Sequence, residues 1–470
     1  MNLKRATLIL CSLALGLAGC ARYQPKPLSV RDTAERLESR TLDHPELRKI
    51  LEQTLHRAFA VWPPQVWDFP SLEAAAYFYH PSLAVARAQW RVAKAGVITA
   101  GARPNPTIGV TPEYNFNPAS GVSPWIATLP LDIPIETAGK RGYRVARAQH
   151  RSVAAHLNIA TVAWQVRSNL RAALLDFTDA TRREKLLQAQ QAIQEEAGRR
   201  LEQKLRAGAI ETLELSRARL ALARSRVEAG EARRQASEAL ARVAEAIGVP
   251  LGALQGVVIA EDWKRPAETN LTTDQARRQA LQSRPDVLAA LADYDASQSA
   301  LQHEIAKQYP NIHLGTGYQF DQGENKWALG VTAEIPVLNR NQGPIAEAQA
   351  RRTEAAARFL SVQSKAMAEM DRALAVYRNA QERLDSLAAL RAALQQPAAS
   401  FAAQVQAGAA EPLDLLAVRT EQAATELLEW DARVQLVRSF GQLEEAIQCP
   451  LGISGAIESP PNAAVTHPPP

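Results

Sequence analysis

The chain has 470 residues, and its 54 Lys and Arg against 49 Asp and Glu leave a formal net charge of only +5 at pH 7. These charges alternate along Ala- and Leu-rich stretches, which is typical of solvated helix faces and excludes a concentrated nucleic-acid-binding surface. Motifs of zinc proteases, P-loops and dinucleotide sites do not occur, and the eight histidines are scattered. The sequence therefore predicts no enzyme, no catalytic residue, no metal site and no cofactor.

The N-terminus predicts an exported lipoprotein. MNLKRATLILCSLALGLAGC has two basic residues, an apolar run and small residues before Cys20. The run is too short to cross a bilayer comfortably, which takes about 20 apolar residues, so residues 1–19 are predicted to be a signal peptide. Leu17-Ala18-Gly19-Cys20 resembles a bacterial lipobox, with Cys20 as the lipidated first residue of the mature chain. An ordinary secretory signal is the alternative. Ala21, in place of the Asp that retains inner-membrane lipoproteins, favours the outer membrane.

The rest of the chain is a tandem duplication. KLRAGAIETLEL from Lys204 and QVQAGAAEPLDL from Gln404 share A-G-A-x-E-x-L-[ED]-L at an offset of 200 positions, as do AIGVPLG from Ala246 and AIQCPLG from Ala446. Upstream matches drift to offsets of 202 and 204, which small insertions explain. The predicted parts are a lipid anchor and N-terminal periplasmic segment, a first repeat, a linker, a second repeat and a Pro-rich disordered tail. Their ranges are 20–70, 71–250, 251–272, 273–452 and 453–470.

Long helices make up most of each repeat. Residues 138–206 contain no proline and predict a rod of about 100 Å at 1.5 Å per residue. One apolar stripe follows that rod at helical spacing: Val162, Val166, Leu170, Leu174 and Phe177. Beyond it, Leu213, Leu220 and Val227 recur every seven residues, as in a coiled-coil seam. Each repeat also has a shorter leading helix, predicted at about 72–103 and 273–309.

The two A-G-A segments predict the tips of helical hairpins. Gly208 and Gly408 are suited to the left-handed conformation that ends a helix. Glu211 and Glu411 follow where a new helix begins and its dipole favours an acid. The first tip comprises Leu205, Arg206, Ala207, Gly208 and Ala209, and the second comprises Val405, Gln406, Ala407, Gly408 and Ala409.

Two segments in each repeat alternate with a period of two and predict β-hairpins. They are PTIGVTPEYNFN with WIATLPLDI, and the stretches around HLGTGYQF and WALGVTAEI. These hairpins could lie half-buried on a soluble core, or they could be transmembrane strands of about 9–11 residues with one face toward lipid. The lipid anchor favours the membrane. Four strands cannot close a barrel without an edge in lipid, so the barrel is expected to be shared between protomers.

The lipobox, the duplication, the hairpins flanked by long helices and the paired tips together resemble the TolC-like outer-membrane efflux proteins. PIETAGKRGYRVARAQ from Pro134 is similar to the segment that leaves the second strand in the CzcC-like, cation-efflux branch. The resemblance implies a mainly α protein with a small transmembrane β part. It also implies a homotrimer, in which a twelve-stranded β-barrel stands on a periplasmic α-barrel, although the strand count alone allows two, three or four protomers.

The resemblance implies a function as well: a passive exit duct in the outer membrane, served by a periplasmic adaptor and an inner-membrane pump of RND type. The tips would dock the adaptor. Relatives narrow their periplasmic mouth with acidic side chains after the second tip, and Asp414 matches one such position. A first-turn acid that only stabilises the helix dipole is the alternative for Asp414. Metal cations are suggested as substrate by the branch alone.

Two rival functions remain at this point. One is a periplasmic coiled-coil scaffolding lipoprotein without channel activity. The other is the adaptor itself, which normally has one helical hairpin inserted in a β domain, so that the duplication argues against it.

Overall fold

The computed structural model describes residues 22–260 and 273–451, which belong to two compact units. The smaller unit ends at Thr41 and contains helix α2 (Val30–Glu38), whose first turn is capped by the Ser29 hydroxyl. The larger unit begins at Leu42 and contains every other element. Cys20, most of the predicted linker and the predicted tail lie outside the described residues.

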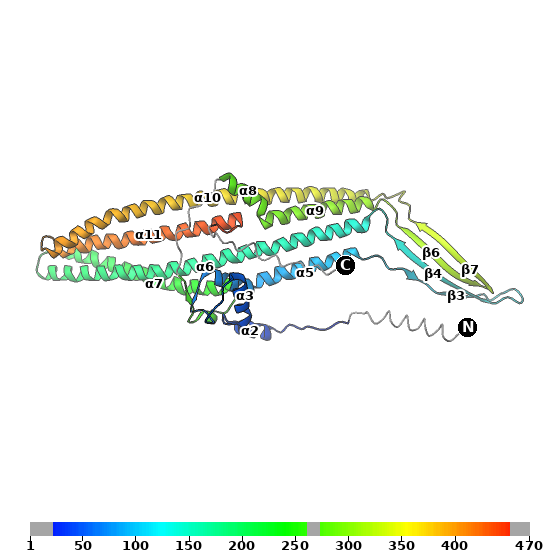
Figure 1. Ribbon diagram of the computed structural model, residues 1–470, viewed down its shortest axis with the longest axis horizontal. Helices are drawn as coiled ribbons and strands as arrows, with labels where there is room; N and C mark the ends of the chain where they lie inside the picture. Colours follow the sequence, from blue (N-terminus) through cyan, green and yellow to red (C-terminus); the bar gives the residue numbers. More distant parts are fainter. Residues whose placement is uncertain (1–21, 261–272, 452–470) are drawn as a thin grey trace. The chain divides into compact units, whose positions relative to one another are not determined.

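The long helices of the larger unit pack side by side as two hairpins. α6 (Lys140–Arg206) and α10 (Gln342–Gln406) have 67 and 65 residues. α7 (Thr212–Ile247) returns along α6, and α11 (Pro412–Ile447) returns along α10 while also packing on α6 (Figure 1). The predicted rod and the mainly helical fold are confirmed. Within the described ranges, no helix combines the length and apolar character needed to cross a bilayer.

Each leading helix is broken in two, so the prediction of continuous helices there was wrong. α4 (Phe69–Tyr79) and α5 (Pro81–Gly101) are separated by His80, and α8 (Thr273–Ser283) and α9 (Pro285–Ala306) are separated by Arg284. The separating residues have extended backbone, with ψ of 125° and 120°. The reason is the proline that follows each of them, whose ring disfavours helical conformation at the preceding residue. α5 then packs on α6, and α9 packs on both α6 and α10.

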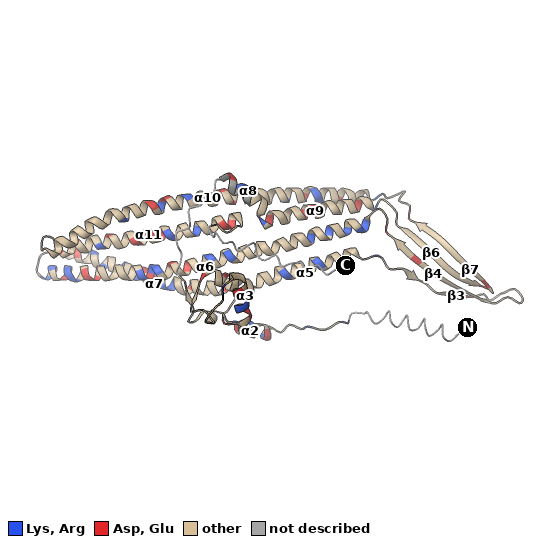
Figure 2. Cartoon of the chain, viewed as in Figure 1, with Lys and Arg blue, Asp and Glu red and all other residues tan. Residues whose placement is uncertain are grey.

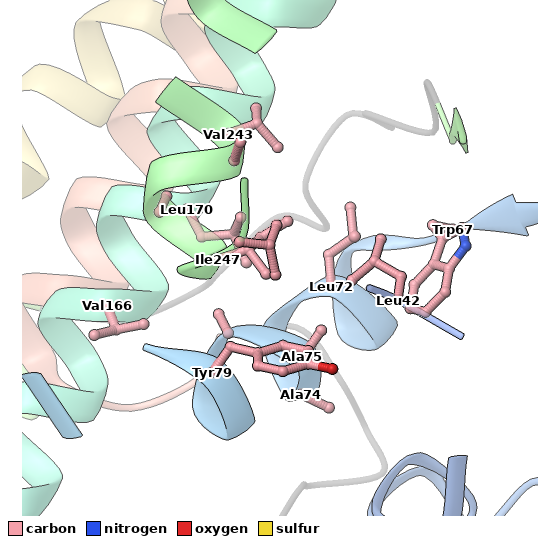
Figure 3. Packing of buried hydrophobic residues seen from close by; sticks show 14 of the residues in the cluster. Leu42, Trp67, Leu72, Ala74, Ala75, Tyr79, Val166, Leu170, Val243 and Ile247 are labelled. Atoms are coloured by element: carbon pink, nitrogen blue, oxygen red, sulfur yellow. The ribbon is translucent and has the colours of Figure 1, made fainter. Parts of the chain in front are cut away.

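The largest hydrophobic core lies where α4, α6 and the end of α7 meet. Leu72, Leu170 and Ile247 are fully buried in it, next to Trp67 and Val243 (Figure 3). α3 (Pro45–Leu55), the 3-10 turn Leu251–Leu254 and strand β1 (Val66–Trp67) also contribute, and β1 pairs in parallel with β5 (Val258–Ile259). The predicted stripe of α6 is confirmed, because its central members are buried here and its outer members pack against them.

The predicted coiled-coil seam of α7 is not buried within the chain. Leu213, Leu220 and Val227 are 55%, 54% and 73% exposed. The face of α7 that is buried consists mostly of small side chains, such as Ala229 and Ala232. Leu215, Val243 and Ile247 are buried as well, whereas the three seam residues are left exposed.

The strands form one antiparallel sheet that joins the two repeats. β2 (Thr107–Ile108) and β3 (Thr111–Tyr114) are two pieces of one edge strand, and both pair with β4 (Trp125–Ile135). β4 pairs with β6 (Ile312–Asp321), which pairs with β7 (Glu324–Ala333). Residues 115–124 connect β3 to β4, whereas a two-residue turn with positive φ at Gln322 and Gly323 connects β6 to β7. Both predicted hairpins are confirmed.

The register separates an apolar from a polar face of the sheet. Trp125, Leu129 and Leu131 alternate along β4 with Thr128 and Asp132. Pairing puts Tyr318 and Trp327 on the apolar side, and it puts His313, Gln319, Lys326 and Thr332 on the polar side. Figure 2 shows charged residues spread along all the long helices and only a few on the strands.

Candidate functional site

The two tips have the same backbone conformation. Gly208 and Gly408 both have φ of +72°. In the first tip the Ala209 N–H donates to the Lys204 carbonyl at 2.9 Å, and the Gly208 N–H donates to the Leu205 carbonyl at 3.0 Å. In the second tip the corresponding distances are 2.8 and 3.1 Å, for the N–H groups of Ala409 and Gly408. This pair of bonds is the Schellman motif, in which a left-handed residue satisfies the last carbonyls of a helix.

The tips also present the same surface. Four consecutive residues of each tip are exposed, 206–209 and 406–409, and the residue before each run is half-buried. A Cβ atom on either glycine would meet nothing within 4 Å. Glycine is therefore required by the backbone and not by close packing inside the chain. Glu211 and Glu411 are the N-cap residues of α7 and α11, and neither side chain makes a capping hydrogen bond.

An ion pair connects the two tips. The Lys204 ammonium at the end of α6 contacts the Glu411 carboxylate at the start of α11. These side chains are 36% and 62% exposed. An exposed pair of this kind contributes about 0–1 kcal/mol at most, so it adds little to the stability of the tips.

Asp414 lies in the first turn of α11 and is exposed. Its backbone N–H donates to the Glu411 carbonyl at 3.1 Å. Glu214 has the same position in α7, with its N–H donating to the Glu211 carbonyl at 3.2 Å. Both tips are thus followed by an acid at one helical position, although only the second was singled out from the sequence.

The sheet is anchored to the helices by polar contacts that cross between repeats. The buried Lys140 ammonium donates to the Tyr309 carbonyl and the Asn311 side chain, at 2.6 Å each. The Thr137 hydroxyl donates to the Pro310 carbonyl. These bonds join Thr137, just before α6, and Lys140, its first residue, to the chain entering β6, and they fix the two central strands relative to α6.

Apolar side chains on one face of the sheet and on helices α5 and α7 are exposed to solvent in the single chain. On β7, Trp327, Leu329 and Val331 are 81%, 74% and 68% exposed. α5 and α7 both pack on α6, and both have exposed apolar side chains at similar spacing. We call the members that recur every seven residues the outer stripe: Val85, Val92, Leu213, Leu220 and Val227. Exposed apolar surface of this extent indicates contact with another molecule or with lipid.

The polar face of the sheet holds one pair that sequence reasoning missed. Asp132 and His313 lie in contact across β4 and β6, whereas the sequence places them 181 positions apart. Only the pairing of the two repeats brings them together. Among residues 22–260 and 273–451, no group of three His, Cys, Asp or Glu side chains gathers as metal ligands.

The sequence model of the outer membrane efflux proteins matches this chain twice, over residues 76–249 and 276–447. The chain belongs to the outer membrane efflux protein family. Members of this family are efflux channels and not a class of enzyme. The family therefore accounts for both the long helical hairpins and the small sheet.

Individual relatives agree with this membership. The cobalt-zinc-cadmium resistance protein CzcC of Cupriavidus metallidurans is 24% identical over 278 residues, or 58% of this chain and 63% of CzcC. The match thus spans less than two thirds of that relative. The structure of the outer-membrane channel OprN matches with a TM-score of 0.66 at 19% identity, and the match covers 92% of this chain and 99% of the OprN chain. VceC of Vibrio cholerae has a TM-score of 0.66 at 18% identity, covering 81% and 95%. These structures share the fold of the family member described here.

Proposed function

We propose that the protein is the outer-membrane channel of a tripartite efflux system, a passive duct for substrate delivered by an inner-membrane pump and a periplasmic adaptor. The observation that carries this proposal is the sheet. One face of the sheet is apolar and exposed, and the other face is polar. The sheet itself is held to the start of α6 by the contacts of Lys140. Strands with one apolar and one polar face suit a membrane span around an aqueous path. Membership of the efflux family supports the same function.

The channel is proposed to be a homotrimer. In the described part of the chain, β7 pairs only with β6, and the β2/β3 edge pairs only with β4. Both sheet edges therefore have free backbone groups, which are not tolerated in lipid. Pairing β7 of one copy with the β2/β3 edge of the next satisfies them. The outer stripe supplies an apolar surface for the same contact between helices.

The remaining assignments follow from this architecture. The tips are proposed to dock the adaptor, because their shared shape gives it similar sites around one mouth. Asp414 is proposed to line that mouth, and Cys20 to hold a lipid anchor in the outer membrane. The pump is proposed to be of RND type. Metal cations are the proposed substrate, since the relative CzcC is named for cobalt, zinc and cadmium resistance.

Conductance tests the channel. The purified protein should produce discrete ion-conducting steps in a planar lipid bilayer without any nucleotide. Leu329→Arg, on the apolar face, should abolish insertion, because an arginine facing lipid near the bilayer midplane costs about 2–4 kcal/mol. Ala328→Arg is the matched control on the polar face and should still insert. A coiled-coil scaffold would conduct in no variant, and equal effects of the two arginines would contradict the assigned faces.

Anchoring needs its own test. Cys20→Ala should abolish incorporation of labelled palmitate and leave the signal uncleaved or misprocessed. The Cys449→Ala control should be labelled normally, because that half-buried thiol lies at the far end of the second repeat. A mature N-terminus at another residue, without an acyl chain, would refute the lipoprotein assignment.

A further inference from the structure

Asp132 and His313 form an isolated acid–imidazole pair on the polar face of the sheet. The His313 Nδ1 atom lies 3.0 and 3.3 Å from the two carboxylate oxygens of Asp132. Asp132 is directly opposite Gly315, and His313 is opposite Pro134, so the two side chains meet diagonally across neighbouring strands. Diagonal neighbours on one face of an antiparallel pair are within reach of long side chains.

This contact indicates which ring nitrogen of His313 carries the proton. An ionised carboxylate can only accept hydrogen bonds, so Nδ1–H of His313 is the donor. In the neutral ring the lone pair is then on Nε2, which is the atom left to meet solvent. A histidine that donates one ring N–H to a carboxylate and binds metal through the other nitrogen is a common arrangement in metal sites, because the carboxylate orients the ring and raises its basicity.

The pair is exposed on the polar face of the sheet. The side chains of His313 and Asp132 are 41% and 42% exposed. Asp132 is opposite Gly315, which is opposite Gly330 on β7. Next to the Asp132 side chain, the two neighbouring strands therefore have no side chain at this level. A Cβ atom on either glycine would approach nothing closer than 3.7 Å. A hydrated ion therefore has room to reach Nε2 along this face.

No basic side chain other than His313 pairs with Asp132 within the described residues. Lys326, on the same face, contacts Asp321 and Glu324 at the opposite end of the strands. In the described part of the chain, no lysine or arginine side chain therefore competes with an ion for this carboxylate.

We infer that His313 and Asp132 form a weak, transient binding site for a partly hydrated divalent transition-metal ion such as Zn²⁺ or Co²⁺. The inference deepens the proposed function and rests on it for the role of the site in transport. The Nε2 atom is the ligand, Asp132 orients it and attracts the ion, and water completes the coordination. Imidazole suits these metals, whereas Mg²⁺ and Ca²⁺ prefer oxygen ligands. Weakness is expected, because conduction requires an ion to leave as readily as it enters.

Metal binding can be measured without channel activity. We would titrate Co²⁺ into the untagged protein in detergent by calorimetry, and Mg²⁺ in parallel. Wild type should bind one more Co²⁺ per chain than His313→Gln, and Asp132→Asn should weaken that site by about 10- to 100-fold, as expected for a residue that acts through another. His156→Gln, whose ring lies on α6 against Trp90, is the control and should behave as wild type. If His313→Gln and wild type bind Co²⁺ equally, the site does not exist.

A conductance measurement places the site in the conducting path. Zn²⁺ should reduce the single-channel current of wild type more than Mg²⁺ does, and His313→Gln should remove the difference. Asp321→Asn, on the same face but at the other end, should leave the difference intact. Equal action of Zn²⁺ and Mg²⁺ on wild type would overturn the inference although the channel conducts. A protein that never conducts would refute the proposed function instead, and the calorimetric result would still decide the metal site.

Discussion

Arg167 shows how a single side chain connects the two repeats. It is 8% exposed and contacts Glu73 of α4 and Glu444 of α11, the latter at 3.6 Å. The rings of Phe69 and Trp164 lie 5.0 and 5.5 Å from its guanidinium carbon. Burial beside the Glu73 carboxylate also raises the pKa of Tyr77, whose hydroxyl donates to Glu73. A buried cluster of this kind is stable only while its charges remain paired.

Arg167→Met should therefore lower the free energy of unfolding by about 3–5 kcal/mol, because it leaves two buried carboxylates without this partner. Denaturant unfolding followed by circular dichroism would measure the change. Arg199→Met is the control, since Arg199 makes an exposed pair with Glu196, and it should change stability by about 0–1 kcal/mol at most. Similar losses in the two variants would mean that the buried cluster has no special role.

Asp414 and Glu214 offer a matched comparison at the same scale. Asp414→Asn should reduce the preference of the channel for cations over anions, because a ring of carboxylates at a constriction attracts cations. Glu214→Gln, at the corresponding position after the first tip, should leave ion selectivity unchanged. Reversal potentials in a salt gradient would measure both. If each variant only destabilises its helix by about 0.3–1 kcal/mol and neither alters selectivity, Asp414 is a capping acid and not part of a gate.

At the scale of elements, Gly208 and Gly408 in the two tips need a left-handed backbone conformation, and the space around each of them is open. Valine at φ of +72° is strained, because a left-handed conformation costs an L-residue about 1–2 kcal/mol, and its β-branched side chain would also project from the exposed turn. Space is not the obstacle, since a Cβ at either glycine meets nothing nearby. Substitution should thus change the shape of the tips without disturbing the sheet, which is at the other end of α6.

Replacing Gly208 and Gly408 together with Val should leave membrane insertion intact and abolish both efflux and chemical crosslinking to the adaptor. Gly198→Val, eight residues before the end of α6, is the control, because that glycine is helical and its Cβ would also meet open space. It should retain efflux. Full efflux and normal crosslinking by the double variant would show that the tips are not the docking surface.

The sequence predicted the helices and the faces of the strands, because periodicity and composition are local. It missed the breaks at His80 and Arg284, although the proline after each was visible and disfavours helix at the preceding position. It could not predict that β4 pairs with β6, since alternation within a strand does not identify its neighbour. The contact of Asp132 with His313 depends on that pairing, so it could not be predicted from the sequence. The roles of Cys20, the tips and Asp414 stay predictions.

At the scale of the whole molecule, a single chain leaves the sheet edges and the outer stripe uncovered. Leu220 and Val227 were predicted to lie in a coiled-coil seam, but they are 54% and 73% exposed and match the spacing of Val85 and Val92 on α5. A seam that is regular but exposed is explained if another protomer covers it, as knobs-into-holes packing between copies requires.

Leu220→Glu with Val227→Glu should weaken the proposed trimer by several kcal/mol, since burying a Val or Leu side chain contributes about 1.5–3 kcal/mol and unpaired buried acids add a penalty. Size-exclusion chromatography with light scattering in detergent would report the mass. Val61→Glu, an exposed apolar position outside the stripe, should leave the mass unchanged. A double variant that remains trimeric would exclude the outer stripe as the contact between protomers.

The two hairpins of the sheet have connections of different length, and the longer connection, residues 115–124, suits an inserted surface label. The turn at Gln322 and Gly323 has no residue to spare, because positive φ at both positions sets the register of β6 and β7. Residues 115–124 are different: their ends are already joined by the Asn115 N–H, which donates to the Pro124 carbonyl at 2.7 Å. An epitope inserted after Ala119 would lengthen a closed loop without shifting a strand. In the proposed outer-membrane channel this loop faces outward, so antibody staining of intact cells would report the correctly oriented molecules.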